Sequence, residues 1–337
     1  MRAEKFIAEL MEKMNDFSKE DKEQIREYFE EMIYDRIENG ETEEDILKSF
    51  GTPDVVVAKL KNECKESRVE GKDQEWREQF QEEDRTRKSE NKEGTVNRIH
   101  TIFVHTENVR IIPVVDRVEK PFIEFDPTEG RDILEISEEN GCFKVIHHQK
   151  KIYLFLLFGY EKRRNLILHI PKEFRGNLEL ESGNVPIELE NITSLKSLRA
   201  QTSNAGINLK NVSAVSMKIQ TSNASVKLEN VAGECLNADT SNGKIEAKHI
   251  NIKERTKLRT SNAKVVVEEI ESRQIELHTS NGTVQGMLSG SIVDYNVRSF
   301  TSNASSTLPS HMNTRKDKSL EVKTTNGKIN ILFEKDR

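Results

Sequence analysis

The residues with the most regular spacing in this sequence carry hydroxyl and amide groups. The tetrad Thr-Ser-Asn-Ala/Gly begins at Thr202, Thr221, Thr240, Thr260, Thr279 and Thr301, a variant TTNG begins at Thr324, and a degenerate copy SGNV begins at Ser182. Successive copies start 19 to 23 residues apart. Such an array could bind ice or a crystalline polysaccharide if it were flat and exposed. If it faces inward, stacked hydroxyls and amides satisfy one another's hydrogen bonds instead.

The alternation of side chains before each tetrad favours the inward arrangement. Residues of one parity share a face of a strand, and apolar residues precede the threonine at even spacing, as Met217 and Ile219 precede Thr221. The threonine and the asparagine two positions later are therefore expected on the inward face, and the serine between them on the outward face. The predicted structural ladder consists of Thr202, Asn204, Thr221, Asn223, Thr240, Asn242, Thr260, Asn262, Thr279, Asn281, Thr301, Asn303, Thr324 and Asn326.

Each repeat contains two short strands joined by a corner. Apolar residues return at odd spacing after the tetrad, as at Val226 and Leu228, so the chain bends at Asn-Ala/Gly, where left-handed backbone is tolerated. Two strands and a corner in roughly 20 residues are typical of one rung of a β-solenoid, and rungs bury their apolar sides by stacking about 4.8 Å apart. We therefore expect a mainly β fold, with a right-handed-type β-solenoid of about eight rungs in residues 181–337.

The open edge of the last predicted rung, Thr324–Phe333, needs a cover. Unpaired strand edges pair with other chains, and the ends of solenoids are normally capped. We expect the C-terminal end of the solenoid either to dimerise or to be shielded by a neighbouring element such as the linker.

Three further regions precede the solenoid. Residues 1–64 form a small N-terminal α-helical domain, with apolar residues at helical spacing, as in Phe29, Met32, Ile33 and Ile37. This domain holds 10 Lys and Arg against 18 Asp and Glu, which argues against nucleic-acid binding there because phosphate contacts need clustered cations. We expect residues 65–95 to be a charged linker that could be partly helical, and residues 96–180 to be an irregular, strand-rich N-terminal part of the β domain.

Two apolar groups are candidate contacts for a partner or a membrane. In KKIYLFLLFGYEKRR (Lys150–Arg164), basic residues flank the apolar run Ile152, Tyr153, Leu154, Phe155, Leu156, Leu157 and Phe158. This run is either a buried strand, a tip that enters an anionic bilayer surface, or a partner site. Trp76 and Phe80 lie four residues apart in the linker, and they could dock within this protein, its own oligomer or a foreign partner.

Two resemblances follow from these strings. YFEEMIYDRIENGETEEDILKSFGTP (Tyr28–Pro53) resembles a family of short bacterial α-helical signalling domains that accompany PadR-type regulators or membrane proteins, over about residues 3–62. This resemblance implies an interaction module. The strings LILHIP and TSNG, over about residues 96–334, resemble the bacterial putative-adhesin family of unknown function, whose members form such solenoids. Some relatives act in cell-envelope stress.

No linear motif for catalysis is present in the sequence. HExxH, GxSxG, P-loop and GxGxxG patterns are lacking, and the three cysteines are scattered without a CxxC pair. We therefore expect no enzyme, and no catalytic, cofactor-binding or metal-binding residues.

The N-terminus lacks the apolar stretch of a signal peptide, and no apolar run reaches the roughly 20 residues of a membrane-spanning helix. The expected location is cytoplasmic, with a peripheral membrane or cell-surface location as the alternative. The leading hypothesis is a non-enzymatic scaffold or interaction protein in bacterial regulatory or cell-envelope-stress signalling. Its helical domain would bind a protein, and its solenoid end or linker could form a homo-oligomer. The alternatives are an adhesin-like surface or membrane binder and, more distantly, a polysaccharide-binding or lyase protein.

Overall fold

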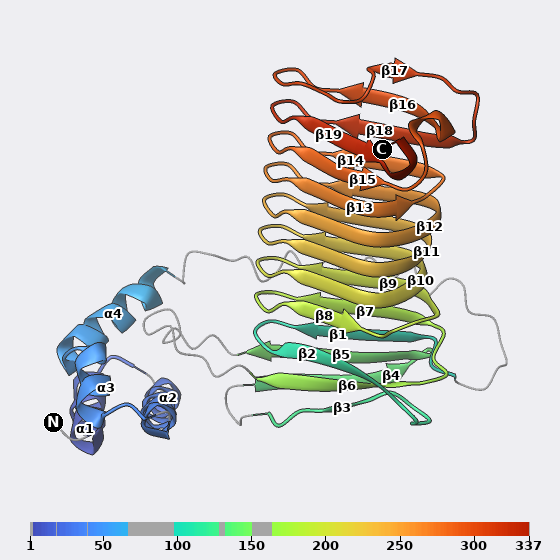
Figure 1. Ribbon diagram of the computed structural model, residues 1–337. Coiled ribbons are helices and arrows are strands. Elements are labelled where there is room, and N and C mark those ends of the chain that lie inside the picture. Colours follow the sequence, from blue (N-terminus) through green and yellow to red (C-terminus); the bar gives the residue numbers. More distant parts are fainter. Residues whose placement is uncertain are drawn as a thin grey trace. The chain divides into compact units, whose positions relative to one another are not determined.

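The computed structural model describes residues 3–17, 19–38, 40–66, 98–127, 132–149 and 164–336 (Figure 1). The chain divides into two compact units, one helical and one made of strands. Each unit has its own hydrophobic core. The expectation of a mainly β fold with a small N-terminal helical part is confirmed. The candidate contacts Trp76, Phe80 and Ile152–Phe158 lie outside the described residues.

The helical unit consists of α1 (Ala3–Lys13), α2 (Lys19–Glu38), α3 (Glu43–Phe50) and α4 (Pro53–Glu66). The rings of Phe6, Phe29 and Phe50 form the centre of its core, with ring centroids 5.2–6.0 Å apart. The Thr42 side chain accepts a hydrogen bond from the Asp45 backbone at the start of α3. Gly51 ends the same helix with a φ of 86°, a conformation that glycine adopts without a steric penalty.

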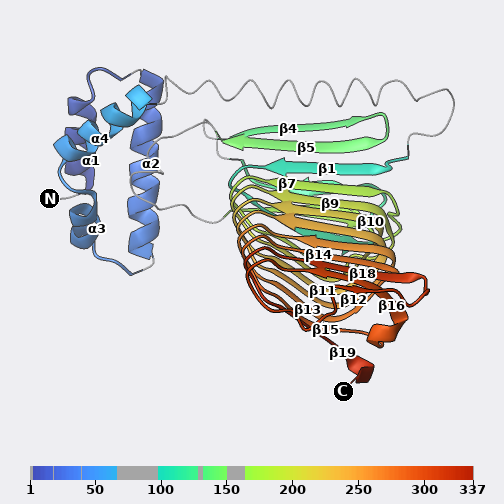
Figure 2. The ribbon, with the colours of Figure 1, turned by 90° about the horizontal axis from the view of Figure 1, so that it is seen from above.

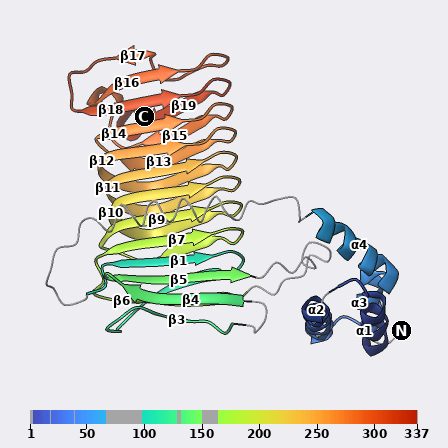
Figure 3. The same cartoon turned by 180° about the vertical axis from the view of Figure 1, so that it is seen from behind.

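The strands of the β unit have the following bounds: β1 (Thr101–Thr106), β2 (Arg110–Asp116), β3 (Phe122–Glu124), β4 (Asp132–Glu139), β5 (Cys142–Gln149), β6 (Asn165–Pro171), β7 (Asn177–Ser182), β8 (Ile187–Glu190), β9 (Leu195–Thr202), β10 (Ile207–Thr221), β11 (Val226–Thr240), β12 (Ile245–Arg259), β13 (Val265–Glu271), β14 (Gln274–His278), β15 (Val284–Leu288), β16 (Tyr295–Phe300), β17 (His311–Met312), β18 (Lys318–Lys323) and β19 (Ile329–Phe333). One face of the stack follows the order β17-β16-β18-β14-β12-β11-β10-β9-β7-β1-β5-β4 (Figures 1 and 3). A second face contains β8, β13, β15 and β19, and β10, β11 and β12 continue from one face to the other (Figure 2).

Successive rungs pair in parallel, with equivalent residues opposite one another. Ile207, Val226, Ile245, Val265 and Val284 are successive partners in this register, and each is at most 1% exposed. The apolar positions of every repeat therefore stack into one continuous core. Parallel strands with an apolar inner side are stable only when that side is covered, and the next rung and the opposite face together provide the cover.

The same stack extends to the N-terminal side of residue 180. Strand β1 pairs in parallel with both β5 and β7, and Thr106 lies opposite Ser182 of the degenerate tetrad. One core cluster runs from Ile102 to Phe333. The strands β2, β6 and β3 form a separate small sheet that packs against the same core. Strands β5, β1 and β7 thus extend the stack on the N-terminal side of the tetrads.

The last two long strands of the sequence do not lie at the end of the stack. Strand β18 pairs on one side with β14 and on the other side with β16, which precedes it in the sequence. Strand β19 pairs with β15 on one side, and Ser306 bridges to Ile329 on the other. The rung made of β18 and β19 is therefore inserted between two earlier segments. The edge of this rung, which was expected to dimerise or to be shielded by a neighbouring element such as the linker, is shielded by residues 295–308 of the chain itself.

Candidate functional site

The threonines of the tetrads form a buried column along one corner of the stack. Six of them, Thr202, Thr221, Thr240, Thr260, Thr279 and Thr324, are at most 5% exposed. Each threonine hydroxyl from Thr221 onward donates to the carbonyl oxygen of the fourth tetrad residue in the adjacent rung. Thr221 donates to Ala205 at 2.9 Å, Thr260 to Gly243 at 2.9 Å and Thr324 to Gly282 at 3.0 Å. These bonds tie each corner to its neighbour and satisfy buried polar groups.

The asparagines form a second column, but it differs from the inward ladder expected from parity. Every tetrad asparagine is exposed. The reason is that the chain already bends after the threonine, so serine and asparagine both lie on the outer side of the corner. Each asparagine side chain donates from Nδ2 to Oδ1 of the asparagine in the adjacent rung: the distance is 2.7 Å from Asn223 to Asn204 and 2.7 Å from Asn326 to Asn281.

This amide ladder continues from Asn108 to Asn303. Asn184 donates to Asn108 at 3.0 Å, and Asn303 donates to Asn326 at 2.6 Å. The amides of the ladder and the hydroxyls of the neighbouring serines are neutral groups. The outer side of the corner is therefore an uncharged polar strip. Its serines, Ser203, Ser222, Ser241, Ser261, Ser280 and Ser302, are exposed.

The fourth tetrad residue is alanine at some corners and glycine at others, and at the glycine corners the backbones of adjacent rungs lie too close for a Cβ atom. A Cβ atom on Gly243 would lie 1.6 Å from the Ala224 carbonyl oxygen, and one on Gly282 would lie 1.7 Å from the Ala263 carbonyl oxygen. The backbone N–H groups of both glycines donate to the threonine hydroxyl of their own tetrad at 3.1 Å. At these two corners the glycine Cα atom therefore packs directly against the backbone of the adjacent rung.

Charged side chains cover the outer faces as ion pairs between rungs. Lys210 lies 3.1 Å from Glu190, and Lys248 lies 3.1 Å from Glu268. The hydrogen bond from Lys210 to Glu190 raises the pKa of the lysine. Exposed pairs of this kind contribute little stability individually.

Several histidines pair with carboxylates near the N-terminal end of the stack. His169 is 13% exposed, stacks on Phe122 with ring centroids 4.2 Å apart, and places Nδ1 2.6 Å from Asp116 and Nε2 3.4 Å from Glu124. These groups come from β2, β3 and β6, so no linear motif could reveal the cluster. Their placement joins the three strands of the small sheet.

Two other groups have shifted acidities near the C-terminal end. Burial lowers the pKa of His278, although Glu321 at 3.1 Å opposes the shift. Burial, with Glu271 and Asp294 nearby, raises the pKa of Tyr295 to about 12. Tyr295 donates to the Ser289 carbonyl oxygen at 3.3 Å. Both side chains therefore have their partners within the β stack.

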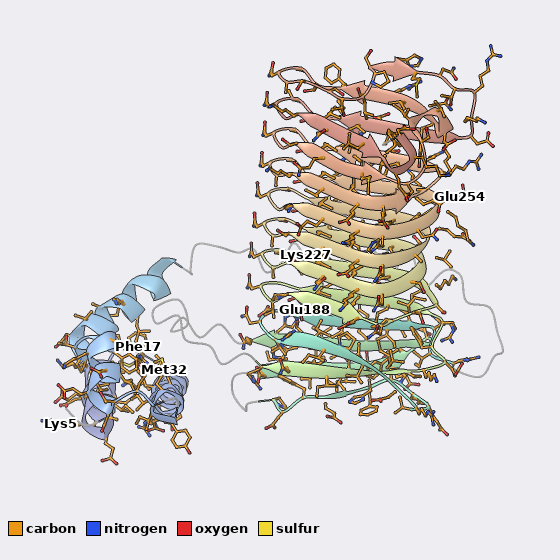
Figure 4. All side chains as sticks on the ribbon, viewed as in Figure 1. Lys5, Phe17, Met32, Glu188, Lys227 and Glu254 are labelled. Atoms are coloured by element: carbon orange, nitrogen blue, oxygen red, sulfur yellow. The ribbon has the colours of Figure 1, made fainter. Side chains whose placement is uncertain are left out.

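The helical unit exposes large side chains that the sequence analysis did not single out as a surface. Tyr34 is 70% exposed and Ile37 is 47% exposed, both on α2, and Val55 on α4 is 45% exposed. Ile37 shares the helical spacing of Phe29, Met32 and Ile33, yet it is exposed near the end of α2. Figure 4 shows the side chains of this unit, with Phe17 and Met32 labelled. In the described part of the chain, no helix has both the length and the apolar character needed to cross a bilayer.

Two family models match the chain. The model described as HAAS matches residues 5–59, and the model described as Toastrack DUF4097 matches residues 99–336. None of the curated proteins compared with the chain matches it. The crystal structure of a "putative cell adhesion protein" from Clostridium sporogenes is 12% identical and covers 71% of this chain and 94% of its own, with a TM-score of 0.26. A score this low supports no structural or functional argument.

Proposed function

We propose that this chain, which belongs to the Toastrack DUF4097 family, is a non-enzymatic scaffold in bacterial regulatory or cell-envelope-stress signalling. In this proposal the helical unit binds a protein partner, and the β stack is the rigid support that presents it. The observation that carries the proposal is the helical unit itself: it has its own core and still exposes Tyr34 and Ile37. Exposed aromatic and aliphatic side chains are common anchors of protein interfaces.

The chemistry of the β unit supports a structural role for it. Its buried threonines bond to backbone carbonyl oxygens, as Thr260 does to Gly243, and its asparagines bond to one another, as Asn242 does to Asn223 at 2.8 Å. Groups engaged in this way hold rungs together. A stack with in-register pairing and one continuous, close-packed core is rigid along its length, and this rigidity suits a support.

The composition of the helical unit indicates the kind of partner. With 18 acidic and 10 basic residues in positions 1–64, it favours a protein with a basic surface around an apolar pocket, because complementary charge speeds encounter and selects partners. The similarity to HAAS over residues 5–59 agrees with an interaction module.

Affinity capture with variants tests this proposal. The full-length protein, the double variant Tyr34→Ser/Ile37→Ser and a control, Val293→Ser/Phe300→Ser, would each be used to capture proteins from bacterial cells. The control removes two side chains of the β unit that are 59% and 54% exposed. We expect a partner that is lost with the first variant and retained with the second.

Retention of every captured protein by the Tyr34→Ser/Ile37→Ser variant would contradict the proposal. If the full-length protein captured nothing and bound anionic vesicles instead, the surface or membrane binder would replace the scaffold as the working hypothesis. Circular dichroism of each variant establishes that it is folded.

A further inference from the structure

The second corner of the stack carries a column of residues in left-handed backbone conformation. Asn191, Asn211, Asn230, His249 and Glu269 have φ values of 59°, 55°, 54°, 51° and 54°. Each lies at the same place in its rung, and His249 and Glu269 are one repeat of 20 residues apart. Left-handed geometry is common for asparagine and costly for other residues with a side chain.

The chemistry of this column changes along its length. Asn211 donates to Asn191 at 2.8 Å, and Asn230 donates to Asn211 at 3.0 Å, so the first three residues form a short amide ladder. At the next two rungs His249 and Glu269 replace asparagine, with His249 Nε2 lying 3.2 Å from Glu269 Oε2. The amide ladder therefore gives way to an imidazole and a carboxylate.

The strand pairing brings a second carboxylate to the same place. In the register of β12 and β13, Lys248 lies opposite Glu268 and Ile250 lies opposite Ile270. His249 and Glu269 lie between these two positions and are not part of the regular strand pairing. The ligand atoms of His249, Glu268 and Glu269 lie within 4.8 Å of one another. All three side chains are exposed, so an ion can reach them from solvent.

We propose that His249, Glu268 and Glu269 bind a divalent transition-metal ion, for which Zn²⁺ is the probe. One imidazole nitrogen and two carboxylate oxygens are a donor set that Zn²⁺ accepts, with water as the fourth ligand. The imidazole disfavours Ca²⁺ and Mg²⁺, which prefer oxygen ligands alone. Because the donors stand on two hydrogen-bonded strands, little chain has to be ordered when the ion binds.

Lys248 is the group that opposes this binding. Its ammonium lies 3.1 Å from Glu268, and it would have to leave that carboxylate when the ion arrives. It therefore competes with the metal for one of the three ligands. Bound metal would join β12 to β13 at a corner where the asparagine ladder has ended, and this role is independent of the function proposed for the helical unit.

Isothermal titration calorimetry of the full-length protein with zinc chloride tests the proposal, together with the absorption spectrum of the Co²⁺-loaded protein. We expect one Zn²⁺ per chain in the wild type. His249→Ala and Glu269→Gln should each weaken binding by at least about 10-fold, since even the loss of a residue that only orients a ligand costs roughly 10–100-fold. Lys248→Ala should tighten binding, because it removes the competitor for Glu268.

His311→Ala is the matched control, because His311 is an exposed histidine on β17. It should leave the affinity unchanged. The proposal is overturned if the wild type binds no Zn²⁺ at millimolar concentration, or if His249→Ala binds it as tightly as the wild type. A Lys248→Ala variant with weaker binding would also contradict it. Circular dichroism of the His249→Ala and Glu269→Gln variants separates a lost ligand from a lost fold.

Discussion

The hydroxyl of Thr260 should stabilise the β unit by an amount that can be measured. Thr260 is 2% exposed and donates to the Gly243 carbonyl oxygen at 2.9 Å. Thr260→Val keeps the shape of the side chain and removes the donor, which leaves a buried carbonyl without that bond. The cost of such a loss is about 1–3 kcal/mol. At roughly 2–4 °C per kcal/mol for a unit of this size, a loss of about 2 kcal/mol lowers Tm by about 4–8 °C.

Thr256 provides a matched substitution with the opposite expected sign. It lies on β12, is 0% exposed, and its hydroxyl finds no hydrogen-bond partner among the described residues. Thr256→Val removes a buried polar group that makes no bond, so the free energy of unfolding should stay unchanged or rise. Both variants would be unfolded by heat and by urea, with circular dichroism as the signal. The reasoning is refuted if Thr260→Val unfolds at the same midpoint as Thr256→Val.

Three further predictions concern a glycine, a tyrosine and a histidine of the stack. Gly282→Ala should lower the free energy of unfolding, measured in urea, by about 3 kcal/mol or more, because its Cβ would lie 1.7 Å from a backbone oxygen. The control Gly206→Ala, whose Cβ would lie 3.1 Å from the nearest oxygen, should lower it clearly less. Equal losses in the two variants would contradict this packing. Burial raises the pKa of Tyr295 to about 12, so the unfolded chain loses this proton first and the free energy of unfolding should fall as pH rises from about 10 toward 12. An ultraviolet titration of the folded protein should show one tyrosine that ionises at higher pH than the others, and Tyr295→Phe should remove it. A titration that this substitution leaves unchanged would contradict the prediction. Burial lowers the pKa of His278, so the unfolded chain binds this proton first and the free energy of unfolding should fall as pH drops below about 6.5. The urea midpoint of His278→Gln should therefore depend less on pH in that range than the midpoint of the wild type. The same pH dependence in both proteins would count against the prediction.

The repeat and its buried column could be predicted from the sequence because parity and period are local properties. Thr221 and Val226 lie on opposite sides of a corner, and their spacing already places both in the core. The asparagine column was placed on the wrong side because parity applies only while the strand continues. The bend begins directly after the threonine, so Asn223 ends on the outer side of the corner, where it is exposed.

The order of the last rungs could not be predicted from the tetrads alone. Each tetrad fits the same place in any rung, so the motif does not specify which rung lies beside which. The spacing did carry a signal: the intervals on either side of Thr301 are 22 and 23 residues instead of 19 or 20. The longer intervals provide the chain needed to pass over one rung and return.

The sites made by adjacent rungs were invisible for a related reason. His249 and Glu269 stand one repeat apart, and each looks like an isolated surface residue in the sequence. Only the pairing of β12 with β13 brings them together. The exposed Ile37 lies four residues after the buried Ile33, so helical periodicity alone did not distinguish it from a core residue, whereas Tyr34 lies outside that period.

The measurement that tests the proposed scaffold most directly is cross-linking of the full-length protein inside bacterial cells, read by mass spectrometry. Lysines occur on both units, with Lys5 on α1 and Lys227 on β11 labelled in Figure 4. We predict that cross-links to other proteins concentrate on lysines of the helical unit, such as Lys5 and Lys48, and disappear with Tyr34→Ser/Ile37→Ser. Cross-links to other proteins that form only at lysines of the β stack, such as Lys227 and Lys253, would contradict the account.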